Sequence, residues 1–263
     1  MDPVLRVALG FALFAAAHIG LAVPAVRRRL VTRLGRWGFT LSFSAVAWIT
    51  FGAAVVSYAA HAHEGPPGFA LAEYPLARLP LIAAIVLGSM LMSGAFARYT
   101  RSPFAFGGEL VREPHGLERV TRHPFFVGVA LLGASHALLA TRLIGAVAMG
   151  SLALFALAGT WFQDQKLLAL RGKPYGDYLA ATSTIPFAAI AAGRQSLIWA
   201  ELPYGTLLLG LVIAFLLRSV HAHIFDHGGA YAIAAVVIGP LVILLAEWRR
   251  DRRARLHSAH AVG

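Results

Sequence analysis

Two histidines of this sequence lie where a hydrocarbon environment is expected. His18 falls about five residues before the end of the apolar segment 4–23, and His136 falls about twelve residues into the apolar segment 124–140. A polar side chain in hydrocarbon costs free energy unless it finds a partner, so such residues usually face the interior of a helix bundle and mark a site. Small residues precede both histidines and would let another helix or a flat cofactor approach closely. Two neutral imidazoles on different helices are the axial ligands that a haem b iron needs.

Other interpretations of these histidines are open. Each imidazole could instead hydrogen-bond a carbonyl or a serine of a neighbouring helix. At a helical rise of about 1.5 Å per residue, His18 and His136 lie at depths of roughly 8 and 18 Å, and helix tilt absorbs only part of that difference. His61 and His63, at the predicted outer membrane face, are alternative partners for His136. Two histidines that are simply exposed to water at the membrane interface would give the same pattern.

Further polar groups stand at the ends of apolar segments. The stretch HAHIFDH contains three histidines that suit zinc, copper or iron, but an exposed polar turn would have the same composition; they are His221, His223 and His227. Arg122 and His123 precede Pro124. The planar fork of an arginine at this position could bind a haem propionate, or the arginine could simply anchor the helix at the membrane surface. Asp164 and Lys166 are interpreted as a charge cluster at a helix end.

The composition places these residues in a membrane. Of the 263 residues, 58% are hydrophobic and 13% are charged, whereas about a quarter of the residues of a soluble domain are charged. Seven apolar stretches approach the ~20 residues that a membrane-spanning helix needs; they are 4–23, 37–60, 79–96, 124–140, 143–162, 204–220 and 229–247. The sequence therefore predicts an all-α fold, a polytopic transmembrane helical bundle of about seven spans. The absence of cysteine excludes disulfides, thiolate metal sites and cysteine nucleophiles.

The positive charges are distributed unevenly between the predicted loops. If alternate loops lie on alternate sides of the membrane, one side receives 19 of the 23 lysines and arginines. The other side receives only Arg6, Arg78, Arg142 and Arg218. By the positive-inside rule, the N-terminus is outside and the C-terminus is cytoplasmic. The net charge of +11 then reflects topology and contact with membrane lipids, so no nucleic-acid binding is expected.

Two short segments complete the predicted architecture. Residues 141–142 are the only link between the fourth and fifth apolar segments, which predicts a tight antiparallel helical hairpin. Residues 174–192 are moderately apolar but interrupted by proline, glycine and tyrosine. These interruptions make the segment unsuited to crossing the membrane as one helix, so it is predicted to be an interfacial or re-entrant segment.

Several motifs together resemble the NnrU family of membrane proteins. They are HIGLAVPAVRRRLVTRLG near the N-terminus, TRHPFFVG and GASHALLA in the fourth helix, and DQKLLALRG and IPFAAIAAGR further on. The resemblance divides the chain into an NnrU-like transmembrane domain of about five spans (1–195), a two-helix transmembrane extension (196–248) and a basic cytoplasmic tail (249–263). The NnrU family contains bacterial proteins linked to denitrification and nitric oxide metabolism, so the resemblance implies the bacterial inner membrane.

The resemblance also implies a cofactor. Relatives of the family, the plant and cyanobacterial 15-cis-zeta-carotene isomerases, are similar to haem b enzymes in which a switch of histidine ligation permits cis-to-trans isomerisation of a carotenoid double bond. The implied iron ligands are His18 and His136, and the other implied cofactor-binding residues are Arg122, His123 and His61 or His63. A hydrophobic polyene is the implied substrate, and the catalytic residues stay unassigned.

A second resemblance leads to a different chemistry. The Arg-His-Pro element and the segment GKPYGDY (172–178) are similar to the integral membrane methyltransferases, such as isoprenylcysteine carboxyl methyltransferase and the phospholipid methyltransferases. That resemblance implies that Arg122 and His123 contact S-adenosylmethionine. However, residues 163–165 are Gln-Asp-Gln where those enzymes carry two glutamates, so one carboxylate is missing. A third interpretation is a non-catalytic membrane partner of a respiratory complex, packed through small residues such as those in 88–94.

Overall fold

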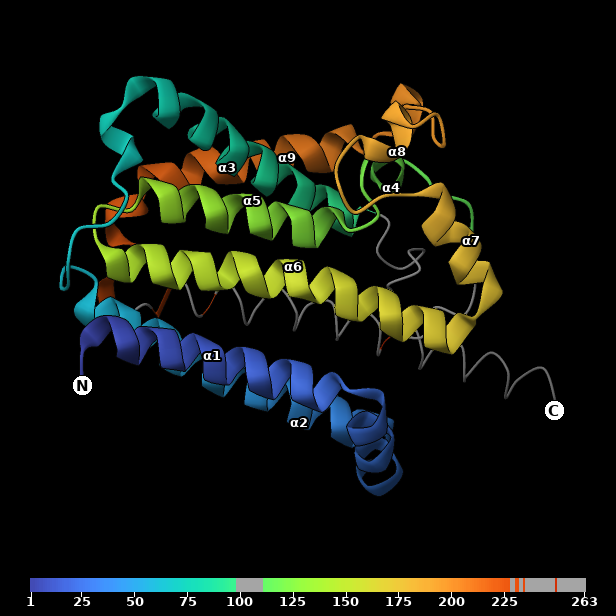
Figure 1. The fold of residues 1–263 in the computed structure, drawn as a ribbon, viewed down its shortest axis with the longest axis horizontal. Helices are drawn as coiled ribbons and strands as arrows, with labels where there is room; N and C mark the ends of the chain where they lie inside the picture. The colour runs from blue at the N-terminus through green and yellow to red at the C-terminus, as the bar shows by residue number, and fades with distance from the viewer. Residues whose placement is uncertain (98–110, 228–229, 232–233, 235–248, 250–263) are drawn as a thin grey trace.

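The computed structural model describes residues 1–97 and 111–227, together with residues 230, 231, 234 and 249. Over this part of the chain it is a bundle of helices (Figure 1). The α-helices are α1 (Pro3–Ala22), α2 (Pro24–His61), α3 (Pro75–Phe96), α4 (Leu117–Val120), α5 (Pro124–Leu139), α6 (Leu143–Arg171), α7 (Lys173–Ala181), α8 (Ala188–Ala191) and α9 (Tyr204–Ser219). Short 3₁₀ helices are η1 (Leu71–Glu73), η3 (Trp199–Glu201) and η4 (His221–His223). The prediction of an all-α helical bundle is confirmed.

Six apolar helices run in alternating directions along the bundle (Figure 1). Four of them, α1, α2, α3 and α6, are long and apolar enough to cross a membrane, and α5 and α9 are shorter apolar helices. They coincide with six of the predicted spans, whereas the remaining one, residues 229–247, lies mostly outside the described residues. Leu5, Leu9 and Leu13 form an outward stripe on α1 and are at least half exposed, as expected of side chains that face lipid.

The helices pack in an order that gives the bundle two distinct ends. α6 packs against α1 on one flank and α5 on another, α5 packs against α3, and α3 packs against α9. The end that contains the α5–α6 turn is called the Arg142 end, and the opposite end is called the Asp164 end. Two backbone hydrogen bonds join this turn to the loop between α2 and α3. The N–H of Gly68 donates to the carbonyl of Thr141, and the N–H of Leu143 donates to the carbonyl of Pro66, each at 2.9 Å. The predicted tight hairpin is therefore confirmed.

Glycine allows a close helix crossing in the bundle interior, between α3 and α5. A Cβ atom at Gly88 would lie 2.6 Å from the carbonyl oxygen of Gly128, and a Cβ at Gly128 would lie 2.6 Å from the carbonyl oxygen of Gly88. Each glycine thus removes a clash with the other helix backbone. Small residues at a crossing are the usual way in which membrane helices approach one another.

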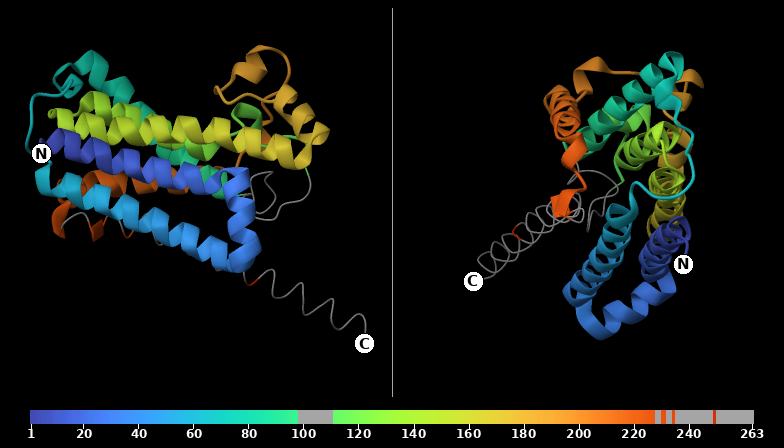
Figure 2. Two further views of the ribbon diagram at one scale, coloured as in Figure 1. Left: turned by 60° about the horizontal axis from the view of Figure 1, so that its bottom comes forward. Right: turned by 90° about the vertical axis from the view of Figure 1, so that its left-hand side faces the viewer.

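α2 contains a sharp change of direction near its start. Gly35 has φ 72° and ψ 169°, outside the helical region, so the basic segment 24–34 forms a separate helix ahead of the apolar one. Figure 2 shows this first segment running across the Asp164 end, between α1 and the long part of α2. Glycine adopts a positive φ at little steric cost, which explains the break at this residue.

Candidate functional site

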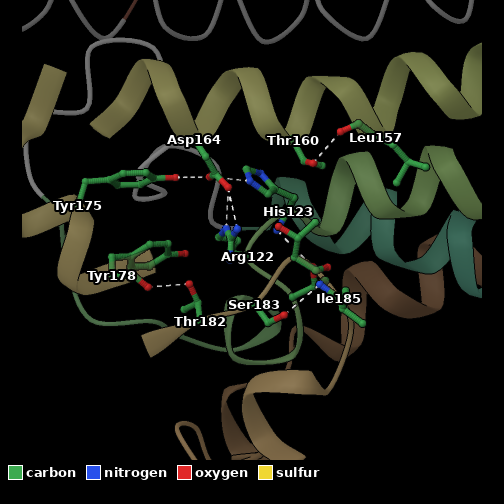
Figure 3. Close-up of polar contacts among 12 residues, drawn as sticks. Arg122, His123, Leu157, Thr160, Asp164, Tyr175, Tyr178, Thr182, Ser183 and Ile185 are labelled. Carbon is green, nitrogen blue, oxygen red and sulfur yellow. Dashed lines mark hydrogen bonds and ion pairs between the residues drawn. The ribbon is translucent and has the colours of Figure 1, made fainter. Parts of the chain in front are cut away.

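The last turns of α6 carry one carboxylate, Asp164, into a buried polar cluster (Figure 3). Its Oδ2 accepts hydrogen bonds from Nε and Nη2 of Arg122, at 2.9 and 2.7 Å. Its Oδ1 accepts one from Nε2 of His123 at 2.8 Å and another from the hydroxyl of Tyr175 at 2.7 Å. These four residues are called the Asp164 cluster.

Local sequence features bring the Asp164 cluster together. His123 is the N-cap residue of α5, and Pro124 takes the first helical position, where a missing backbone N–H is tolerated. Gly172 ends α6 with a φ of 60°, a conformation that glycine adopts without steric cost. The chain then turns back into α7, which packs against α6 and places Tyr175 beside the carboxylate.

The chain after α7 also packs against the start of α5. The backbone N–H of Arg122 donates to the carbonyl of Ser183 at 2.9 Å, and the hydroxyl of Thr121 donates to the carbonyl of Thr184 at 2.7 Å. Residues 174–192 were predicted to be too broken to span. In the structure they form the short helices α7 and α8 and their connection at the Asp164 end.

The Asp164 cluster is shielded from water. The side chain of His123 is 1% exposed and that of Asp164 is 9% exposed. Burial lowers the pKa of His123 against the opposing effect of Asp164, so the imidazole is neutral and donates its Nε2–H. Burial and the hydrogen bond to Asp164 raise the pKa of Tyr175, which keeps its hydroxyl proton. Four donors on one carboxylate leave it poorly placed to accept a proton from a substrate, so the cluster is suited to anchoring helix ends.

The sequence predicts that Asp164 forms a charge cluster with Lys166 at a helix end. The structure instead directs the carboxylate of Asp164 to Arg122, His123 and Tyr175. The available signal was a single acidic residue at the end of a long apolar segment, because a buried carboxylate needs a cation or several donors. A cofactor contact of Arg122 and His123 stays a prediction, and in this structure both direct side-chain donors to Asp164.

A second polar cluster surrounds Glu201 of η3. The guanidinium of Arg119 donates from Nε to Oε2 at 2.8 Å and from Nη2 to Oε1 at 3.1 Å, and the backbone N–H of Gly116 donates to Oε2 at 2.8 Å. The hydrogen bond from Arg119 is the main cause that lowers the pKa of Glu201 to about 2. This pair joins α4 to the segment that leads into α9. The sequence gives no local signal for it, since the two residues are 82 positions apart.

His18 lies among aromatic rings contributed by three helices. Its ring centroid is 4.6 Å from that of Phe43 on α2, 5.3 Å from that of Phe155 on α6 and 5.6 Å from that of Phe14 on α1. Its Nδ1 is buried and has no hydrogen-bond partner among the described residues. A buried nitrogen without a partner carries an unrecovered desolvation cost. This nitrogen therefore fits a ligand that is not part of the chain.

His136 on α5 has its tautomer set by its own helix. Its Nδ1 lies 2.8 Å from the carbonyl oxygen of Leu132, and because a carbonyl only accepts, Nδ1 carries the proton. The Nε2 of the neutral ring is then left with its lone pair. Metal-binding histidines are usually held by a hydrogen bond of this kind from the other ring nitrogen. The ring also lies against that of His221 on η4, with centroids 6.0 Å apart and planes inclined by 11°.

His61 at the Arg142 end uses both ring nitrogens. Its Nδ1 donates to the carbonyl of Ser57 at 2.8 Å, so its Nε2 can accept from Nη1 of Arg6, which lies at 3.3 Å. His63 is exposed. In this structure Nε2 of His61 is therefore occupied, and its assignment to a cofactor stays a prediction.

The predicted site residues thus fall in separate places. Arg122 and His123 meet on Asp164, whereas His18, His136 and His61 have three different sets of neighbours. Within the described residues, no three His, Asp or Glu side chains form a group able to hold a metal ion. The proposed triad of His221, His223 and His227 is accordingly not assembled, and Nδ1 of His223 lies 2.9 Å from Asp226 instead.

The apolar helices run in alternating directions, with histidines between them and a buried charged cluster at one end. These features define a multi-pass α-helical membrane protein. The family described as NnrU protein matches residues 6–228, a range that includes α9. The chain belongs to the NnrU family. The boundary predicted at residue 195 stays a prediction.

Two curated relatives share part of this sequence. The 15-cis-zeta-carotene isomerase of Zea mays chloroplasts is 37% identical over 82 residues, and that of Arabidopsis thaliana chloroplasts is 38% identical over 82 residues. Each match covers 31% of this chain and 22% of the relative, so the chain spans about a fifth of the length of these relatives. No solved structure matches the chain.

Proposed function

We propose that this NnrU-family protein binds haem b between its membrane helices and acts as a redox protein or as a cis–trans isomerase of a hydrophobic polyene. The observation that carries the proposal is the state of His136, whose Nδ1–H is bound to Leu132 while Nε2 keeps its lone pair. Family membership and the similarity to 15-cis-zeta-carotene isomerases support it. A redox role of the same cofactor in denitrification or nitric oxide metabolism is the alternative form of this function.

The intramembrane imidazoles fit a haem iron. His136 would be one ligand, and the resemblance implies His18, whose buried Nδ1 has no partner among the described residues, as the other. When bound, haem would supply an exchangeable iron coordination position that can interact with a conjugated double bond. The aromatic rings around His18 would exclude water from the haem on that side.

We also propose that the Asp164 end faces the cytoplasm of a bacterial cell and the Arg142 end faces outward across the inner membrane. Of the described residues, Arg27, Arg28, Arg29, Arg33, Arg119 and Arg122 lie at the Asp164 end. The Arg142 end carries Arg6, Arg78, Arg142 and Arg218. This asymmetry supports the orientation through the positive-inside rule. An epitope at the N-terminus should be accessible to antibody in spheroplasts without permeabilisation, and accessibility only after permeabilisation would contradict the orientation.

Haem content tests the proposed function. Protein purified from haem-replete cells should carry stoichiometric haem b in a pyridine haemochrome assay, and His136→Ala should alter its Soret band. His115→Ala is the control, because His115 lies beside Glu201, just before α4, and is assigned to no cofactor. A haem-free wild-type protein would refute the proposal. Calorimetric binding of S-adenosylmethionine by that protein would then favour a methyltransferase.

A further inference from the structure

Three basic side chains gather at the Asp164 end of the bundle. They are Arg27 in the segment 24–34, Lys166 near the end of α6 and Arg171, the last residue of α6. Lys166 is partly buried, and the charges that act on its ammonium group are the guanidiniums of Arg27 and Arg171. We propose that these three residues, called the Lys166 cluster, bind the phosphate headgroup of an anionic phospholipid. This lipid site does not depend on haem binding.

Two members of the Lys166 cluster have no acidic partner in the described part of the chain. Neither Lys166 nor Arg27 forms an ion pair or a hydrogen bond with a described carboxylate. Like charges repel, and the partial removal of Lys166 from water costs further free energy unless an anion offsets it. A phosphodiester supplies such an anion, since both ammonium and guanidinium groups bind phosphate oxygens.

The segment 24–34 has the position and the composition of a helix at a membrane surface. It runs across the Asp164 end, at a steep angle to the spanning helices (Figure 2). Arg28, Arg29 and Arg33 are exposed, whereas Leu30 and Val31 are partly buried. A helix that is basic on one face and apolar on the other lies in the plane of the interface and is attracted to anionic lipids. The segment is therefore expected to rest among lipid headgroups.

Arg27 is held against the bundle by an aromatic ring. Its guanidinium carbon lies 5.4 Å from the ring centroid of Phe39, a residue that is buried. This cation–π contact orients the arginine without using a hydrogen-bond acceptor. The N–H donors of its guanidinium are therefore available to phosphate oxygens.

Lys166 lies at the level along α6 where headgroups are expected. Trp161 and Phe162 are exposed and end the apolar segment 143–162, and exposed aromatic residues concentrate at membrane interfaces. Lys166 follows Trp161 by five residues, which correspond to about 7.5 Å along a helix. Its ammonium group would thus meet the lipid phosphate, while the acyl chains would lie along the apolar surface of α6.

Native mass spectrometry of the full-length protein would test this site. Protein in detergent micelles would be titrated with phosphatidylglycerol or with phosphatidylcholine of the same acyl chains, and the fraction that retains one lipid would be compared. The wild type should retain phosphatidylglycerol more strongly. Lys166→Gln and Arg27→Gln should each weaken this retention about fivefold, the change that corresponds to ~1 kcal/mol per basic residue near anionic lipid. Lys166→Arg should preserve it, because the positive charge remains.

Lys173→Gln is the matched control. It removes a lysine at the same end, but that side chain is 84% exposed and already pairs with Asp177, so retention should change little. An unchanged elution volume in size-exclusion chromatography would verify that each variant is folded. Because Arg27 and Lys166 lie on different helical segments, either variant can carry the test if the other fails to fold.

Three outcomes would overturn the lipid site. Equal retention of the two lipids by the wild type would show that the headgroup charge is not recognised. Equal losses in Lys166→Gln and Lys173→Gln would reduce the effect to a general attraction between a basic surface and an anionic lipid. Inorganic phosphate alone, if it protected the protein against unfolding as well as phosphatidylglycerol does, would indicate a soluble phosphate ligand instead.

Discussion

The Asp164→Asn substitution tests whether the Asp164 cluster anchors the helix ends. Asparagine keeps the size of the side chain but removes its charge and replaces one acceptor oxygen with an NH₂ donor. In the wild type each carboxylate oxygen accepts two hydrogen bonds. Oδ2 accepts both of its hydrogen bonds from Arg122, and Oδ1 accepts one from His123 and one from Tyr175. In the variant, one pair of donors would meet the NH₂ group, and the guanidinium of Arg122 would lose its counter-charge.

The magnitude follows from the burial of the cluster. Removing one partner of a buried ion pair costs about 3–5 kcal/mol, because the remaining charge is left uncompensated. Asp164 and Arg122 are 9% and 16% exposed in their side chains, so we expect a loss of about 3 kcal/mol in the free energy of unfolding. Asp177→Asn is the matched control. Its carboxylate is 67% exposed and pairs with Lys173 four residues earlier, a contact worth about 0.3–0.5 kcal/mol.

Equilibrium unfolding in mixed micelles would measure both variants against the wild type. Tyr175→Phe, which removes one hydrogen bond and keeps the charge pair, should lose about 1 kcal/mol and fall between them. If Asp164→Asn lost no more free energy of unfolding than Asp177→Asn, the reasoning would be refuted. The cluster would then contribute little to stability despite its burial.

Two further predictions concern other contacts. Because the folded-state pKa of Glu201 is lowered from 4.5 to about 2, its stabilisation is present above the unfolded pKa and is lost as the pH falls towards 2. Glu201→Gln should therefore flatten the pH dependence of the unfolding midpoint between 4.5 and 2, and an unchanged slope would contradict this. Gly128→Ala should cost about 1–3 kcal/mol, because the new methyl group would lie 2.6 Å from the carbonyl of Gly88. Gly150→Ala should be neutral or stabilising in the same assay, because its methyl group would lie 3.9 Å from the Cβ of Ala137. Equal effects of the two substitutions on the free energy of unfolding would refute the packing argument.

The apolar helices could be predicted from the sequence because each is determined locally. Long apolar stretches specify α1, α3 and α6, and prolines mark the first turns of α1, α2 and α5. The linker of residues 141–142 forces a hairpin whatever surrounds it. Backbone groups in hydrocarbon must be satisfied within the segment, so the helix follows directly from the composition.

The partners of the polar side chains could not be predicted in the same way. Residues Arg122 and Asp164 are 42 positions apart, and their contact depends on how α5, α6 and α7 converge. The contact between His136 and His221 depends on α9 returning along α3 to the Arg142 end. No periodicity in either segment encodes such a meeting.

By itself, therefore, the sequence determined that this chain forms apolar helices, how they alternate, and which polar residues must find partners within them. Only the tertiary structure decided which partners those are: Arg122, His123 and Tyr175 for Asp164, and His221 beside His136. The physical reason is that burial in hydrocarbon is a property of each segment, whereas a hydrogen bond or a ring contact requires a few ångströms between two segments. That distance is set by the packing of the whole bundle.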